Sequence, residues 1–83
     1  MSGRVTLIGK PGCHLCDVAR QVVELVCAEE DLDYVELDIT EDPFLASEYA
    51  AAVPVVLVDG AEVGRFRVSP DAIRAGLRGL AGR

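Results

Sequence analysis

Two cysteines separated by two residues, Cys13 and Cys16, constrain this sequence more than any other feature. An apolar run at residues 5–8 precedes them and a helical pattern of apolar residues follows, so a predicted strand ends and a predicted helix begins at the pair. The first backbone N–H groups of a helix lack partners within the helix, and the helix dipole is positive there. A thiolate on Cys13 can accept those hydrogen bonds. We therefore expect Cys13 to be the more readily ionised thiol.

This cysteine spacing by itself fits half of a zinc site, a structural disulfide or a redox pair. A structural zinc ion needs four nitrogen or sulfur ligands, usually from two such pairs. The only other candidates are His14, which sits inside the pair, and Cys27, which lies about 16 Å further along the same predicted helix. The strand–helix context therefore favours a redox pair and no metal, and we interpret Cys27 as a small buried hydrophobe.

The length of 83 residues indicates one domain, residues 1–83, and a hydrophobic content of 51% argues against disorder. The longest apolar runs are too short for a membrane span or a signal peptide, so we expect a cytoplasmic protein. Three cysteines, an odd number, fit a reducing compartment. The net charge of -6 disfavours nucleic acid and anionic membranes as partners, and we expect a monomer.

The charges are unevenly distributed along the chain. Most acidic residues lie between Glu24 and Glu48, whereas most basic residues lie from Arg65 onward. The simplest interpretation is one solvated acidic face and one solvated basic face. A surface that docks a charged partner is the alternative.

Hydrophobic periodicity and turn residues divide the chain into seven elements. Asp42 before Pro43 and Ser69 before Pro70 are helix-start signals, and Asp59-Gly60 is a hairpin signal. The first strand is apolar almost throughout, which predicts a central position in the sheet. The elements are strand 4–8, a helix from residue 16 to about 29, strand 33–39, a helix from 43 to about 50, strands 52–58 and 61–68, and a helix after 69.

The helices carry further predicted contacts. Gly76 and Gly79 are expected to weaken the last helix by about 1 kcal/mol each relative to alanine. Arg20 can pair with Asp17 or Glu24 at helical spacing. The residues expected to be buried by the last helix are Ile73, Leu77 and Leu80.

Three segments in this order resemble the small glutaredoxin-like domains of the thioredoxin superfamily. They are Pro-Gly-Cys-His-Leu-Cys at 11–16, Asp-Ile-Thr-Glu-Asp-Pro at 38–43, and Val-Pro-Val followed by Val-Asp-Gly at 53–60. The resemblance covers essentially the whole chain. It implies an α/β thioredoxin-like fold of order βαβαββα, with a four-stranded mixed sheet in strand order 2-1-3-4 flanked by three helices. It also implies a cis peptide bond between Val53 and Pro54.

The same resemblance implies roles for individual residues. It assigns Val53 and Pro54 to substrate binding, because the backbone before the cis-proline pairs with an incoming peptide or glutathione. It assigns Lys10 to a glutathione carboxylate or to support of the thiolate. His14 can tune the thiolate or simply face solvent.

Two departures from the glutaredoxin pattern bear on the substrate. His14-Leu15 stands where glutaredoxins usually have Pro-Tyr between the cysteines. Residues 64–69 contain one glycine and two arginines, where glutaredoxins carry two glycines and then acidic or hydroxyl residues. Arg65 and Arg67 are two positions apart in the predicted last strand and so are expected to share one face. We therefore predict poor recognition of glutathione.

The favoured function is a thiol–disulfide oxidoreductase in which Cys13 is the nucleophile and Cys16 the resolving cysteine. Its partners would be a disulfide-containing protein, or a glutathione disulfide, and a thiol reductant; glutathione or another thiol can serve, and no bound cofactor is expected. One alternative is an electron carrier or regulator dedicated to one protein. Another is a dimer that binds a [2Fe–2S] cluster through one cysteine of each protomer and glutathione, which Cys16 and the poor glutathione site disfavour.

Overall fold

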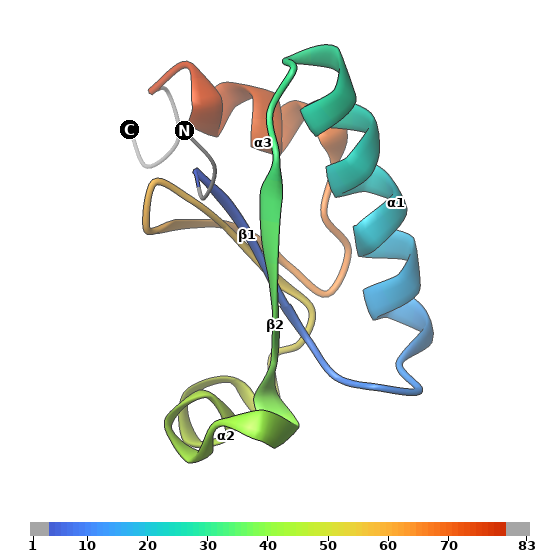
Figure 1. Cartoon of the computed structure of the whole chain (residues 1–83), viewed down its shortest axis with the longest axis vertical. Coiled ribbons are helices and arrows are strands. Elements are labelled where there is room, and N and C mark those ends of the chain that lie inside the picture. Colours follow the sequence, from blue (N-terminus) through green and yellow to red (C-terminus); the bar gives the residue numbers. More distant parts are fainter. Residues whose placement is uncertain (1–3, 80–83) are drawn as a thin grey trace.

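β1 (Val5–Gly9) is the central strand around which the sheet is assembled (Figure 1). The computed structural model describes residues 4–79. Strand β1 pairs in parallel with β2 on one side and antiparallel with β3 on the other, and β3 pairs antiparallel with β4. The sheet order is β2-β1-β3-β4, as the resemblance implied. The other strands are β2 (Tyr34–Asp38), β3 (Val55–Val58) and β4 (Ala61–Arg65).

The two later helices begin at the predicted capping residues, Asp42 and Ser69. The Asp42 carboxylate accepts the Phe44 N–H at 2.9 Å, and Ser69 Oγ accepts the Ala72 N–H at 3.1 Å. A short 3-10 helix, η1 (Ile39–Glu41), follows β2 and was not predicted. The predicted burial of Leu80 lies outside the described residues. The helices are α1 (His14–Glu29), α2 (Pro43–Tyr49) and α3 (Pro70–Leu77).

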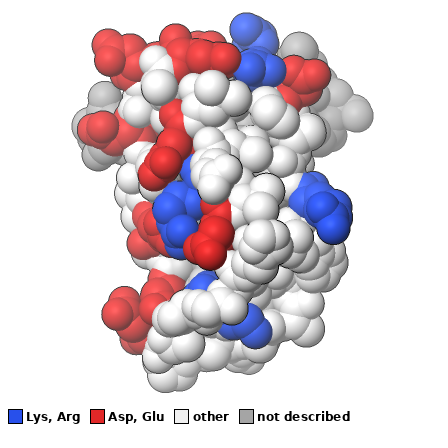
Figure 2. All heavy atoms as spheres, turned by 90° about the vertical axis from the view of Figure 1, so that its right-hand side faces the viewer, with Lys and Arg blue, Asp and Glu red and all other residues white. Residues whose placement is uncertain are grey.

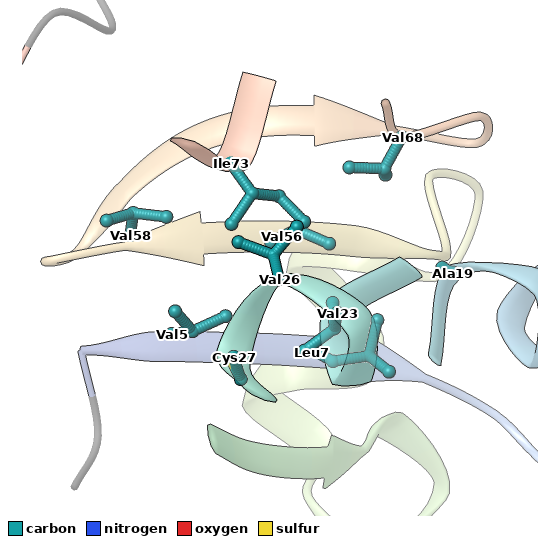
Figure 3. Close-up of a cluster of buried hydrophobic side chains, with 10 residues drawn as sticks. All are labelled: Val5, Leu7, Ala19, Val23, Val26, Cys27, Val56, Val58, Val68 and Ile73. Atoms are coloured by element: carbon teal, nitrogen blue, oxygen red, sulfur yellow. The ribbon is translucent and has the colours of Figure 1, made fainter. Parts of the chain in front are cut away.

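The alternation of side chains along β1 and β3 produces two apolar clusters, one on each face of the sheet. The larger one joins the sheet to α1 and α3 (Figure 3). Its residues are Val5, Leu7, Ala19, Val23, Val26, Cys27, Val56, Val58, Val68 and Ile73. Ile73 is fully buried, as predicted, and Leu77 packs against the edge of the cluster.

The second cluster lies on the other face and reaches the end of the sheet where β1 leads into α1. Ile8 and Val55 supply its sheet residues, and Leu45 and Tyr49 of α2 pack against it. Helix α2 lies at that same end, at the bottom of Figure 1. The cluster also contains Cys16, and Cys13 packs against it. Both thiols are therefore held in place by apolar packing.

At the opposite end of the sheet, Arg4 forms hydrogen bonds that link three segments. Its guanidinium forms two hydrogen bonds with the Asp59 carboxylate, at 2.8 and 3.0 Å, and a third with the Leu77 carbonyl at 3.0 Å. Asp59 and Gly60 both have positive φ, 52° and 84°, as the predicted two-residue hairpin requires. This contact joins the start of β1, the hairpin and the end of α3.

Strand β4 is shorter than predicted. It ends at Arg65 instead of residue 68, because Phe66 adopts a left-handed backbone with φ of 62°. The expectation that Arg65 and Arg67 share one strand face is therefore wrong. In addition, Arg65 is paired with Glu62 at 2.7 Å, which offsets its charge.

Edge strand β2 departs from the predicted alternation of a buried and a wet face. Glu36 points toward α1, where it pairs with Arg20 at 2.6 Å, whereas Val35 is 38% exposed. The reason is that α2 is short and covers only one end of the face on which Val35 lies. Arg20 also pairs with Asp17, as predicted, but Glu24 instead accepts a hydrogen bond from the Tyr34 hydroxyl at 2.9 Å.

Candidate active site

Cys13 is the capping residue of α1, with an extended backbone (φ -100°, ψ 113°). Its Sγ accepts a hydrogen bond from the Cys16 N–H at 3.2 Å, and its carbonyl accepts the Asp17 N–H at 3.2 Å. Gly12, with φ of 72°, makes the turn that leads into this geometry. Helix α1 thus starts two residues earlier than predicted, and a helical N–H group points at the sulfur of Cys13 as the sequence indicated.

Cys16 lies one turn further and is only 1% exposed. Burial raises the pKa of its thiol to about 11, and the hydrogen bond with Cys13 adds to that rise. A backbone hydrogen bond at Lys10 and the charge of Arg20 act in the opposite direction. The two cysteines therefore differ sharply in environment: Cys13 is half-buried at the surface, and Cys16 is a buried, protonated thiol beneath it.

The segment before β3 lies against the thiols. The Val53–Pro54 bond is cis, as the resemblance implied. Val53 belongs to the same cluster as Cys16, and Cys13 packs against that cluster. Within residues 4–79 the main-chain N–H and carbonyl of Val53 have no hydrogen-bond partner. They remain free to pair with another extended chain.

Lys10 and His14, the predicted tuning residues, flank the pair and are both exposed. In the described part of the chain, neither side chain forms a hydrogen bond or an ion pair. Lys10 lines a hollow of about 170 Å³ beside the site. The same hollow is lined by Arg20, Glu36 and Asp38, which the sequence did not connect with the thiols because β2 brings two of them there from a distance.

Cys27, the third cysteine, is not part of this site. It is 3% exposed and belongs to the larger cluster, on the α1 and α3 face, which confirms its interpretation as a buried hydrophobe. Burial raises the pKa of its thiol, and Asp33 adds to this. Among residues 4–79, no three His, Cys, Asp or Glu side chains are grouped so that they could hold a metal ion.

Charged side chains are unevenly distributed over the face that carries α1. Figure 2 shows the face that carries α1: acidic side chains gather over its upper and left-hand parts, whereas its lower right part is mostly uncharged. That lower end is where α1 begins in Figure 1. No helix within residues 4–79 is both long and apolar enough to cross a membrane.

Residues 4–78 match the model of the glutaredoxin-like domain (DUF836). The chain belongs to this glutaredoxin-like family. The match spans every described element, from β1 to α3, and the Cys13–Cys16 pair lies within it.

Two kinds of relative accompany the family match. An uncharacterized protein of Mycobacterium tuberculosis (strain ATCC 25618 / H37Rv) is 35% identical over 78 residues, covering 87% of this glutaredoxin-like chain and 79% of the relative. Among solved structures, protein XcR50 from X. campestris has a TM-score of 0.74 at 29% identity, covering 90% of this chain and 96% of the other. Mitochondrial thioredoxin 3 from Saccharomyces cerevisiae, in its oxidized form, has a TM-score of 0.58 at 27% identity, covering 92% and 76%. These matches establish the thioredoxin fold.

Proposed function

We propose that this glutaredoxin-like chain is a dithiol thiol–disulfide oxidoreductase that reduces disulfides in proteins. The observation that carries the proposal is the position of Cys13. Its sulfur caps α1 and accepts the N–H of Cys16 at 3.2 Å, and Cys13 packs against the apolar cluster that contains the buried Cys16. The fold similarity to a protein named as a thioredoxin in its oxidized form supports the same chemistry.

The reaction begins with Cys13. Its thiolate attacks one sulfur of the substrate disulfide, forming a mixed disulfide and releasing the other sulfur as a thiolate. Cys16 then gives up its proton to solvent or to the departing thiolate and attacks Sγ of Cys13. The products are the Cys13–Cys16 disulfide and the fully reduced substrate, so two electrons pass from the protein to the substrate. Two equivalents of a thiol reductant, glutathione or another thiol, restore the pair by the reverse exchange and leave joined as the reductant's own disulfide.

The order of the two attacks follows from the environment of Cys16. Burial is the largest cause of the raised pKa of its thiol. The hydrogen bond with Cys13 and the charge of Cys13 raise this pKa further. Once Cys13 is bonded to the substrate, its sulfur no longer carries a charge. Formation of the mixed disulfide therefore lowers the pKa of Cys16 and activates the resolving thiol only when it is needed.

The substrate backbone has a place to bind beside the thiols. An extended segment can pair with the free N–H and carbonyl of Val53, which brings its disulfide toward Cys13. Glutathione needs more than this, because its two carboxylates and its ammonium group each require a partner. Lys10 can serve one carboxylate, but Pro70 removes one N–H from the start of α3. We therefore expect protein disulfides to be better substrates than glutathione mixed disulfides.

The test is stoichiometric reduction of an oxidised protein, such as insulin, by the reduced and desalted chain. The wild type should become oxidised with a Cys13–Cys16 link in mass mapping, Cys13→Ser should be inactive, and Cys16→Ser should accumulate a mixed disulfide on Cys13. Cys27→Ala is the matched control, because it removes a thiol outside the site and should leave the reaction intact. Full reduction by Cys13→Ser would overturn the proposal.

A further inference from the structure

Phe66 combines two features that are rarely found together. Its backbone is left-handed, with φ of 62°, and its side chain is 45% exposed. A bulky residue with positive φ is a conformational outlier, because Cβ then crowds the backbone. Phe66 belongs to neither apolar cluster, so burial of the ring does not offset that cost.

Phe44, another exposed aromatic residue, shows that exposure by itself means little. It is 68% exposed but lies in the first turn of α2, where an ordinary helical backbone accommodates it. Single exposed apolar side chains are common on protein surfaces. What distinguishes Phe66 is that glycine or asparagine would suit its backbone better, while the structure holds an aromatic ring there in water.

The position of Phe66 is fixed relative to the candidate site. Arg65 is the last residue of β4 and pairs with Val55 of β3. Immediately beyond this pair, the Phe66 N–H donates a hydrogen bond to the Pro54 carbonyl at 2.8 Å. Phe66 is therefore attached to the segment whose preceding residue, Val53, packs in the thiol cluster and has a free backbone.

We propose that Phe66 is a specificity-determining residue that binds an apolar side chain next to the cysteine of a polypeptide disulfide. This inference rests on the proposed function and names its substrate class. An extended substrate paired with Val53 would run past the Phe66 ring, which presents a rigid apolar surface at little cost in side-chain entropy.

The experiment uses three oxidised substrates and pre-reduced, desalted protein in single-turnover reactions. Two are peptides of the same sequence with one internal disulfide, carrying either leucine or serine next to a cysteine; the third is hydroxyethyl disulfide, which is too small to reach the ring. Phe66→Gly is expected to lower the second-order rate constant for the leucine peptide by roughly tenfold, since burial of an apolar side chain is lost. The serine peptide and hydroxyethyl disulfide should change less than twofold.

Three further variants and measurements complete the test. Phe66→Tyr keeps the ring and should retain the preference for leucine. Leu25→Ala removes a side chain that is 52% exposed on α1, about 14 Å along the helix from Cys16, and should leave all three rates unchanged. Phe66→Gly should unfold at the same temperature as the wild type or higher, because glycine tolerates positive φ.

The outcomes separate the two proposals. A wild type that reduces hydroxyethyl disulfide but does not distinguish the peptides, or a Phe66→Gly variant that slows all three substrates equally, would overturn the role of Phe66 alone. A wild type that reduces none of the three would overturn the proposed function itself.

Discussion

Gly9 lies so close to Cys16 that a side chain at position 9 would press on the buried sulfur. A Cβ built on Gly9 would be 3.1 Å from Sγ of Cys16 and 3.3 Å from its Cβ. Such contacts are tighter than ordinary van der Waals distances, and Cys16 has little room to retreat because it is 1% exposed.

We therefore predict that Gly9→Ala lowers the free energy of unfolding by about 1–3 kcal/mol, as overpacking does. Disulfide geometry is narrow, and a displaced Cys16 strains the oxidised pair. The reduction potential, measured by equilibration with thiol buffers, should therefore become less negative. Gly64→Ala is the matched control, because its Cβ would meet Val68 at 3.2 Å, away from the thiols. It should reduce stability and leave the potential unchanged; an equal shift in both variants would contradict the argument.

Gly76→Ala should destabilise the protein, although helix propensity predicts a gain of about 1 kcal/mol. A Cβ at Gly76 would lie 2.9 Å from Cγ1 of Val63 and 3.1 Å from Cβ of Val58, because α3 packs tightly on the sheet. We expect a loss of about 1–3 kcal/mol in urea unfolding. Adding Val63→Ala should recover part of it, since that change removes the nearest atom. A Gly76→Ala variant more stable than wild type would show that α3 can shift away from the sheet.

The stability of the reduced protein should fall between about pH 9 and pH 11. Cys16 has an ordinary pKa of 9.0 and a folded-state pKa of about 11, so the folded state holds this proton more tightly than the unfolded state does. The stabilisation is fully present below pH 9 and is lost as the pH rises toward 11. Its size is on the order of 2 kcal/mol.

The measurement is urea unfolding of the reduced wild type and of Cys16→Ser at pH 8, 9, 10 and 11. The wild type should lose more stability than the variant over this range. Some loss should remain in both, because the pKa of Cys27 is also raised and that of Tyr34 is raised to about 12. Parallel curves for the two proteins would mean that Cys16 does not contribute.

The three thiols should react with iodoacetamide in a fixed order. Cys13 is half-buried at the helix start, whereas Cys16 and Cys27 are 1% and 3% exposed with raised pKa values. We predict single modification at Cys13 under native conditions at pH 7 and modification of all three in denaturant. Peptide mapping by mass spectrometry gives the order. Early labelling of Cys27 would indicate that α1 opens away from the sheet.

The sequence predicted what depends on local signals. The capping residues Asp42 and Ser69 and the hairpin residues Asp59-Gly60 all occupy their expected places. The cis bond before Pro54 and the order of the strands came from the resemblance and are confirmed. No local pattern could have supplied them, because both depend on contacts between segments distant in the chain.

What the sequence could not predict depends on single backbone angles and on which side chains meet. The left-handed Phe66 ended β4 early, although its sequence neighbours continue an alternating strand pattern. Arg20 of α1 forms an ion pair with Glu36 of β2 and not with Glu24 of its own helix. Helix periodicity describes neighbours within one element, and it carries no information about the partner that a sheet brings alongside.

The burial of Cys27 in the larger cluster also limits how many electrons one molecule can hold for disulfide reduction. Under the proposed chemistry only Cys13 and Cys16 exchange electrons, because the third sulfur is enclosed among Val5, Val23 and Val26 and their neighbours. One reduced molecule then carries a single pair of electrons and must be reduced again after each disulfide that it reduces. In a cell, the rate of substrate reduction would therefore be limited by how fast the reductant regenerates the Cys13–Cys16 pair.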